Sequence, residues 1–332
     1  MKAILCRNYC PPDRLQWEET AKPAPADDEV LLRVRAAAVN PLDWHFVRGE
    51  PRPGRLAFGL FHPKEIRVGR DVAGEIEAVG KSVTRLHAGD AVFGVCVGAF
   101  AEYACAKETK VAAKPAVVTF EQAASTPIAG LTALQGLRDD GKVRSGQRVL
   151  INGAAGGVGT FAVQIAKALG TEVTGVCSGR NTELVRSLGA DRVLDYARED
   201  FTRGKEKYDV IFDLVGNHSF VACRRALTAE GRFVGAAGPG PEHRRPQHWL
   251  RGLAPGMILS ASGKQKMLFC FAKIGSEDLG VLASMMESGK LRAVIDRTYP
   301  LNDAGQALAY VEEGHARGKV VVTVGGASQA RS

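Results

Sequence analysis

The chain alternates apolar runs with segments of helical periodicity between residues 148 and 237. The runs typical of buried strands are residues 148–152, 172–177, 192–195, 208–215 and 231–237. Helical segments follow near residues 160–169, 182–188 and 219–227. Strands that alternate with helices in this way predict an α/β fold with a doubly wound parallel sheet.

The N-terminal part has a different pattern. From residue 30 to about residue 114 it gives short alternating strands with closely spaced glycines, as in 29–36, 74–80 and 89–94. This pattern predicts a compact β-rich barrel. The chain of 332 residues also exceeds the ~250–300 residues that one hydrophobic core usually serves. We therefore expect two domains.

A glycine-rich turn, GAAGGVG at 153–159, lies between the first strand of the α/β part and the following helix. Glycines have no Cβ to hold a ligand away, and the helix directs unpaired amides at the turn. Together they predict a cradle for the diphosphate of a dinucleotide. The residues expected to line it are Ala155, Gly156, Gly157 and Val158. Ligands of such sheets bind at the carboxyl ends of the strands, which adds 178–181, 214–216 with Val215, and 236–238 to the same crevice.

The end of the second strand bears on the choice of dinucleotide. An NAD site commonly has an acidic side chain there, but residues 175–181 contain no Asp or Glu. Ser178 and Arg180 offer a hydroxyl and a guanidinium, which suit a 2′-phosphate. Arg180 could equally be a solvated residue at the start of a helix. The missing acid favours NADPH.

Composition excludes several functional classes. The hydrophobic share of 45% and the charged share of 24% are those of a globular protein, without a long apolar run that could span a membrane. The N-terminus lacks the apolar stretch of a secretory signal, so we expect a cytoplasmic protein. The net charge is +8, but Lys and Arg are scattered, which argues against a nucleic-acid partner. The seven cysteines form no C-x-x-C pair and indicate free thiols.

One local concentration of positive charge, residues 243–251, has two interpretations. It is either a solvated surface loop, which we favour, or a flap that contacts an acidic or amphipathic substrate or a membrane surface. The sequence leaves the role of this loop open.

Five motifs together resemble the medium-chain dehydrogenase/reductase superfamily, in particular its zinc-free quinone oxidoreductase branch. They are VNPLD at 39–43, GRDVAGEIEAVGKSVTRLHAGDAVFG at 69–94, GLTA at 130–133, AAGGVG at 154–159 and HARGKVV at 315–321. The resemblance implies a GroES-like β-rich catalytic domain formed by residues 1–122 and 267–332. It also implies a Rossmann NADPH-binding domain at 123–266.

The same resemblance bears on metal binding. Zinc-dependent relatives hold the metal with a Cys where this chain has Asn40, and with a His-Glu pair where it has Arg70-Asp71. An amide and a guanidinium cannot replace a thiolate and an imidazole, so we expect no zinc. Without that Lewis acid, reduction of a quinone or an activated C=C is favoured over alcohol oxidation.

The family's roles carry over to matching residues. Asn40 resembles the amide near the nicotinamide and the substrate oxygen, and Thr132 the hydroxyl at the nicotinamide end. Tyr196 resembles a tyrosine that holds the 2′-phosphate; half-buried packing is its alternative. Gly238 and Phe269 are expected beside the nicotinamide.

Two further side chains follow the Asn-Pro motif. His45 is a candidate general acid, although a lone histidine is more often only a hydrogen-bonded or exposed side chain. Asp43 is expected to fix the loop by accepting backbone hydrogen bonds. In many relatives an aromatic hydroxyl follows this motif, and its absence here leaves the proton donor open.

The sequence thus predicts NADPH-dependent reduction of a small quinone or α,β-unsaturated carbonyl. Two alternatives stay open. One is a trans-acting enoyl-thioester reductase of lipid or polyketide synthesis, and the other is an NADPH-binding protein without turnover. A homodimer is compatible with the sequence, which does not identify the physiological substrate.

Overall fold

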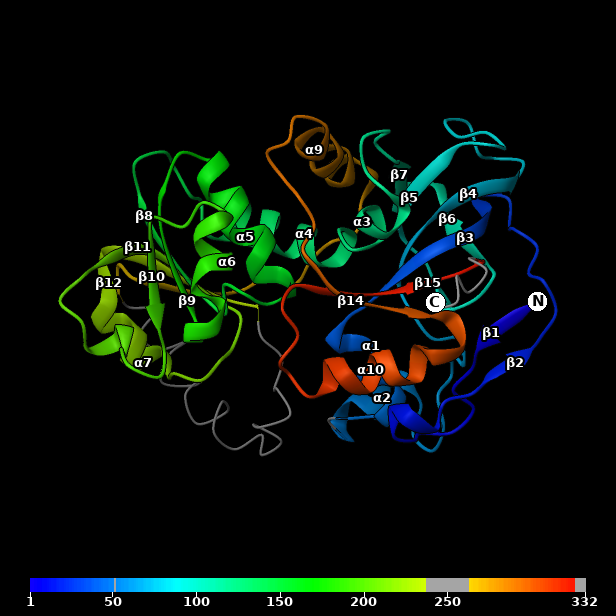
Figure 1. Ribbon diagram of the computed structural model, residues 1–332, viewed down its shortest axis with the longest axis horizontal. Coiled ribbons are helices and arrows are strands. Elements are labelled where there is room, and N and C mark those ends of the chain that lie inside the picture. Colours follow the sequence, from blue (N-terminus) through cyan, green and yellow to red (C-terminus); the bar gives the residue numbers. More distant parts are fainter. Residues whose placement is uncertain (51, 237–262, 326–332) are drawn as a thin grey trace, which may run out of the picture. The chain divides into compact units, whose positions relative to one another are not determined.

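The structure is a computed structural model that describes residues 1–50, 52–236 and 263–325 (Figure 1). The chain divides into two compact units, each described here by itself. The first comprises Met1–Ala129 and Ile274–Ser332, and the second comprises Gly130–Lys273. The sequence analysis placed the corresponding boundaries after residue 122 and before residue 267.

The first unit is built around a seven-stranded sheet in the order β14-β15-β3-β4-β5-β7, with β6 paired to β3. Its strands are β3 (Glu29–Val39), β4 (Asp71–Val79), β5 (Ala91–Val95), β6 (Tyr103–Lys107), β7 (Val111–Ala113), β14 (Ile295–Pro300) and β15 (Lys319–Thr323). A small second sheet pairs β1 (Lys2–Ile4) with β2 (Trp17–Glu19). Both chain ends thus contribute to one β-rich unit, as predicted.

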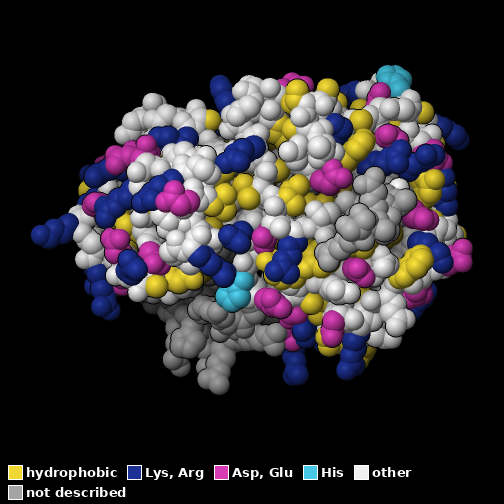
Figure 2. Space-filling model, in the orientation of Figure 1, with side chains coloured by type: hydrophobic (Ala, Val, Ile, Leu, Met, Phe, Trp, Pro, Cys, Tyr) yellow, Lys and Arg dark blue, Asp and Glu magenta, His cyan; other side chains and the backbone are white. Residues whose placement is uncertain are grey.

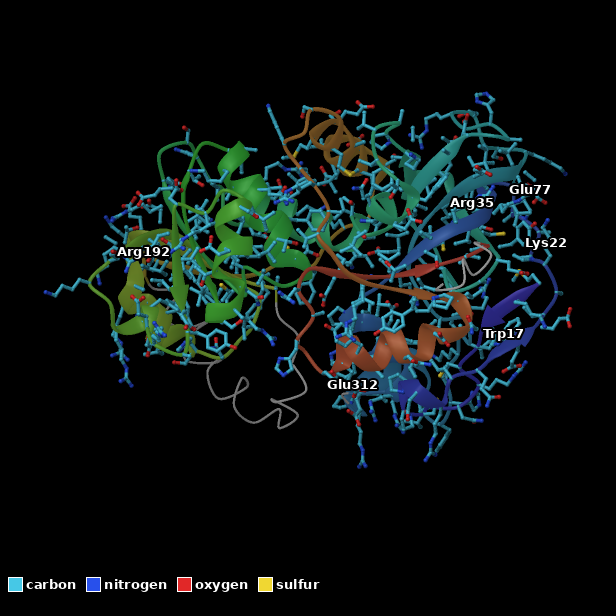
Figure 3. All side chains as sticks on the ribbon, in the orientation of Figure 1. Trp17, Lys22, Arg35, Glu77, Arg192 and Glu312 are labelled. Atoms are coloured by element: carbon cyan, nitrogen blue, oxygen red, sulfur yellow. The ribbon has the colours of Figure 1, made fainter. Side chains whose placement is uncertain are left out.

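Helices close this sheet and carry the loops at its ends. They are α1 (Pro41–Arg48), α2 (Arg55–Phe58), α3 (Phe120–Ala124), α9 (Ser276–Glu287) and α10 (Ala304–Glu312). Helices α1 and α10 lie side by side in Figure 1, and Arg48 of α1 donates to Glu312 of α10 at 2.9 Å. Glu312 is labelled in Figure 3. Between the helices and the sheet lies a core that includes Val39, Trp44 and Leu308.

The register of three adjacent strands brings distant residues to one edge of the sheet. Ala38 of β3 pairs with Asp71 of β4, and Val39 pairs with Val320 of β15. The end of β3 therefore lies beside the beginnings of β4 and β15. Asn40, Asp71 and Lys319 occupy these strand ends although they are far apart in sequence.

The second unit contains the predicted parallel sheet. Its six strands run in the order β10-β9-β8-β11-β12-β13, and every pairing is parallel. The strands are β8 (Arg148–Asn152), β9 (Glu172–Cys177), β10 (Arg192–Asp195), β11 (Tyr208–Asp213), β12 (Leu227–Gly235) and β13 (Lys266–Phe269). Helices α5 (Gly157–Ala168), α6 (Thr182–Ser187) and α7 (Phe220–Cys223) connect them. The predicted α/β fold class is confirmed.

The second unit departs from the sequence analysis at α7, β12 and β13. The helix expected at 219–227 is α7 followed by a 3-10 turn, Arg224–Ala226, and β12 begins at Leu227, before the expected residue 231. Strand β13 was not predicted, because its four residues, Lys-Met-Leu-Phe, show no clear period of their own. It joins the sheet through its register with β12.

Helix α4 (Pro127–Gln135) connects the two units along the chain. In the described part of the chain no helix is long and apolar enough to cross a membrane. All seven cysteines are free, as expected, and Cys177 is a buried residue of β9. Lys and Arg side chains are spread among acidic ones over the face seen in Figure 2.

Candidate active site

A cluster of four buried polar residues occupies the sheet edge of the first unit. Asn40, Asp43, Asp71 and Lys319 are each no more than 3% exposed. Two glycines shape the backbone that leads to it. A Cβ on Gly69 would lie 2.8 Å from the Phe100 ring, and one on Gly318 would lie 2.3 Å from the Val294 carbonyl oxygen. Both glycines also have positive φ angles. The backbone next to the cluster therefore adopts conformations that residues with a side chain rarely adopt.

Hydrogen bonds connect the four side chains. Lys319 Nζ donates to Asn40 Oδ1 at 2.7 Å, and Asn40 Nδ2 donates to Asp71 Oδ2 at 2.9 Å. Lys319 Nζ also lies 3.5 Å from Asp71 Oδ2. The Asn40 backbone N–H donates to Asp43 Oδ2 at 2.8 Å, which confirms the expected loop-fixing role of Asp43. Asn40 begins α1, with Pro41 in the first helical position where proline is favoured.

Burial governs the ionisation of both carboxyl groups. Desolvation raises the pKa of Asp43 to about 7, against the hydrogen bond from the Asn40 backbone. The pKa of Asp71 is also raised by desolvation, and the ammonium of Lys319 opposes that rise by favouring the charged form. The ion pair with Lys319 is therefore what makes a charged carboxylate at position 71 compatible with complete burial.

Asp71 also supports the start of α4. Its Oδ1 accepts the backbone N–H of Ile128 at 3.1 Å, within the first turn of the helix. A carboxylate at this end accepts from a helix N-terminal amide and is favoured by the helix dipole. The same helix carries Thr132, one turn further along and half-buried. Asp71 thus contacts both Asn40 and the first turn of α4.

His45 is placed differently. Its ring stacks on Trp44 with centroids 3.6 Å apart, and Nδ1 lies 3.1 Å from the Glu50 carbonyl oxygen. A carbonyl only accepts, so Nδ1 carries the hydrogen. Burial lowers the pKa of His45, which favours the neutral imidazole. These contacts close the C-terminal turn of α1, and the general-acid role stays a prediction.

The glycine-rich turn of the second unit has the shape of an anion cradle. Gly156 precedes α5 in an extended conformation. Because a glycine has no side chain, it provides no acceptor for the first amides of the helix. A Cβ on Gly156 would meet nothing closer than the Gly153 carbonyl oxygen at 3.4 Å. Gly159 is tightly packed instead, since its Cβ would lie 2.1 Å from that oxygen. Gly159 therefore seats the helix, and Gly156 leaves room for a ligand.

A polar network that the sequence analysis missed holds the neighbouring loop. Asp213 Oδ1, at the end of β11, accepts from Asn152 Nδ2 at 2.9 Å and from the backbone N–H of Val215 and of Gly216, each at 3.0 Å. Val215 in turn packs on the turn, because a Cβ on Gly153 would lie 2.9 Å from Val215 Cγ2. Asn and Asp at the ends of two neighbouring parallel strands were the available signal.

The end of β9 carries the residues expected at a 2′-phosphate. Arg180 is exposed, and Tyr196 is 61% exposed, which excludes the alternative of half-buried packing. The Tyr196 backbone N–H donates to the Cys177 carbonyl oxygen at 3.1 Å, which places Tyr196 next to Ser178 in space. The sequence analysis missed Asp195. A Cβ on Gly179 would lie 2.7 Å from its Oδ2, which places an acid at this tip after all, contributed by the adjacent strand.

The other predicted cofactor contacts are only partly described. Phe269 ends β13 opposite Gly235 and is 41% exposed, at the carboxyl edge of the parallel sheet. Gly238 and the basic loop 243–251 lie outside the described residues. Among residues 1–50, 52–236 and 263–325, no group of three or more His, Cys, Asp or Glu could hold a metal ion.

Comparison with known proteins agrees with this architecture. Residues 26–116 match the family model of the alcohol dehydrogenase GroES-like domain, and residues 188–322 match that of the zinc-binding dehydrogenase. The chain is 35% identical to a chloroplastic quinone-oxidoreductase homolog of Spinacia oleracea, over 93% of this chain and 94% of that protein. It is 32% identical to a trans-enoyl reductase of Aspergillus terreus, over 90% of this chain and 86% of that protein.

Solved structures show the same fold over nearly the whole chain. The quinone oxidoreductase of Coxiella burnetii has a TM-score of 0.85 and 31% identity, covering 98% of this chain and 99% of that one. The Escherichia coli quinone oxidoreductase, solved with NADPH, has a TM-score of 0.83 and 26% identity, covering 97% and 100%. This chain belongs to the medium-chain dehydrogenase/reductase superfamily, as a quinone oxidoreductase-like member. It is an oxidoreductase that uses a nicotinamide cofactor, which removes the alternative of a binding protein without turnover.

Proposed function

We propose that this protein uses NADPH to reduce a small quinone or α,β-unsaturated carbonyl, without zinc. The observation that carries the proposal is the contact of the Lys319 ammonium with Asn40. By the family resemblance, Asn40 stands where zinc-dependent relatives have a metal-binding cysteine. A buried ammonium 2.7 Å from the Asn40 amide oxygen would repel a divalent cation there.

The residues of the second unit fit the cofactor. The amides at the start of α5 and the open side of Gly156 would hold the diphosphate. Ser178, Arg180 and Tyr196 would hold the 2′-phosphate. The Asp195 carboxylate near Gly179 would repel the phosphate. Arg198, whose Nε lies 3.7 Å from Asp195 Oδ2, would weaken that repulsion. When bound, the cofactor supplies a hydride.

The chain's own polar groups would then bind and orient the substrate. Asn40 has two amide hydrogens and gives one to Asp71, so it keeps one for a carbonyl oxygen of the substrate or for the nicotinamide amide. Thr132 would contribute a hydroxyl at the nicotinamide end. Neutral His45 is poorly suited to give up a proton at neutral pH, which favours water as the proton source.

A substrate panel followed by NADPH absorbance tests the proposal. Benzoquinone and a simple enone should be reduced. Elemental analysis should find no bound zinc, and chelators should leave the activity unchanged. The matched assay is oxidation of primary alcohols with NADP⁺, where we expect no turnover. One zinc per chain, with activity lost on its removal, would reject the zinc-independent mechanism.

The second candidate is reduction of an enoyl thioester, favoured by the similarity to the Aspergillus terreus trans-enoyl reductase. Its own test is an enoyl thioester in the same panel. A kcat/KM far above those of quinones and enones would select this function. A cytoplasmic location is also part of the proposal. The spinach relative, in contrast, is chloroplastic.

A further inference from the structure

The buried ion pair of Lys319 and Asp71 has a consequence for the side chain between its partners. A side-chain amide has an oxygen that only accepts and a nitrogen that only donates. Lys319 only donates, and an ionised Asp71 only accepts. Asn40 touches both, with Oδ1 on Lys319 and Nδ2 on Asp71.

The reversed orientation of the amide is excluded by charge. It would turn the Nδ2 hydrogens toward the ammonium and the Oδ1 lone pairs toward the carboxylate. Two hydrogen bonds to charged groups would be replaced by two repulsive contacts. The two charges therefore select one of two shapes that are otherwise nearly identical.

Both charged groups already have partners within the first unit: Lys319 donates to Asn40 and Asp71, and Asp71 accepts from Asn40 and Ile128. The side chain of Asp71 is 0% exposed and that of Lys319 is 3% exposed. Both are also anchored to strand ends whose register is fixed: Asp71 pairs with Ala38, and Val320, next to Lys319, pairs with Val39. The pair is therefore placed to orient Asn40.

We infer that Lys319 and Asp71 are positioning residues that fix the amide orientation of Asn40, so that its second N–H is the group left to bind substrate or nicotinamide. This inference rests on the proposed function of Asn40. Lys319 thereby supplies, from within the chain, the buried positive charge that a metal ion supplies in zinc-dependent relatives. Asp71 extends the same control to the first turn of α4 through Ile128.

The test removes both orienting charges without leaving one of them unpaired. In the double variant Lys319→Met/Asp71→Asn, neither position of the pair carries a charge, and the amide at position 71 keeps an acceptor for Ile128 and a similar volume. We expect it to fold with a melting temperature near that of the parent. Its kcat on benzoquinone should fall at least tenfold, while the dissociation constant of NADPH stays within twofold.

Single variants provide the controls. Lys319→Met leaves Asp71 buried and unpaired and should lower the melting temperature far more than the double variant does. Lys319→Arg keeps the charge and the donor, and should retain more turnover than Lys319→Met/Asp71→Asn if it folds. A folded double variant with parental kcat would overturn the inference.

A second readout does not depend on turnover. In protein labelled with ¹⁵N-asparagine, the Asn40 side-chain amide is identified by its absence in Asn40→Ala. Its hydrogens should exchange slowly with solvent in the parent and much faster in the double variant. Equal exchange in both would contradict the inference. If the parent reduces no quinone or enone, the proposed function fails, whereas this exchange measurement still decides whether the pair fixes the amide.

Discussion

The two regions that carry the predicted site residues are built in opposite ways. In the first unit, Asn40, Asp71 and Lys319 are joined by hydrogen bonds and are buried. In the second unit, the turn at 153–159 leaves amides and space open, and Arg180 and Tyr196 are exposed.

The difference follows from what each region has to do. A closed cluster fixes the geometry of a few atoms, and it is held by the high cost of leaving any buried charge unpaired. An open turn recognises a charged ligand with backbone groups and gives up its own stabilising contacts to do so. Breaking the ion pair of the first region should therefore lower stability, whereas filling the open space of the second should lower cofactor affinity.

The largest expected effect is on the closed cluster. Lys319→Met alone should lower the free energy of unfolding by about 3–5 kcal/mol, because it leaves the buried Asp71 carboxylate without a partner. Lys107→Met is the matched control, since the Lys107–Asp28 pair has an Nζ–Oδ2 distance of 2.7 Å but is more than half exposed. It should leave the denaturation midpoint unchanged within error. Similar midpoints for both variants would show that burial of the Lys319 pair is unimportant.

Next in size is a pair of glycine substitutions within the turn. Gly159→Ala should cost about 3 kcal/mol, because its Cβ would overlap the Gly153 carbonyl oxygen. Gly156→Ala has room and an ordinary φ of −81°, so it should keep the stability and weaken NADPH binding. Denaturation and NADPH titration measure the two quantities. The description of the turn as an open cradle fails if Gly156→Ala binds NADPH like the parent.

A smaller effect is expected at the tip of β9. Arg180→Ala should weaken NADPH binding roughly tenfold, the size of one charge-assisted hydrogen bond, and leave NADH binding unchanged. Arg198→Ala and Asp195→Asn sharpen the result. The first should weaken NADPH binding slightly, and the second should strengthen it by removing a negative charge. Equal NADPH and NADH affinities in the parent would show that the 2′-phosphate contacts are absent.

The smallest prediction concerns pH. The pKa of Asp43, raised to about 7, exceeds its unfolded value, so the folded state binds more protons and stability falls as pH rises through 7. With half a proton bound on average, this group removes about 0.7 kcal/mol between pH 6.5 and 7.5. Asp43→Asn keeps an acceptor for the Asn40 backbone and should flatten that slope. Thermal denaturation at both pH values measures it, and an unchanged slope in Asp43→Asn would exclude Asp43 as its source.

Local features of the sequence were enough for much of the second unit. The strands 148–152, 172–177 and 192–195 were predicted with the bounds that the structure has, because each is a short apolar run between turn residues. The glycine-rich turn was also found from local sequence, by its closely spaced glycines. Strand β13 was missed, since its place depends on pairing with β12 and not on its own period.

The sequence analysis found no acid at the end of β9, and this is correct for residues 175–181 themselves. Asp195 reaches that tip from β10, whose register pairs Asp195 with Cys177. A search along one strand cannot find a side chain that its neighbour contributes. The proposed preference for NADPH therefore depends on the balance between Arg180, Asp195 and Arg198, which only the sheet brings together.

The sequence by itself determined the class of fold, the position of the glycine-rich turn and the choice of Asn40 as a candidate site residue. It did so because these depend on periodicity, glycine and short motifs that are read locally. Only the tertiary structure decided what Asn40 touches. Residues 40, 71 and 319 meet because β15, β3 and β4 pair in one register. Two charges that look like ordinary surface residues in the sequence become, once buried there, the groups that orient the amide.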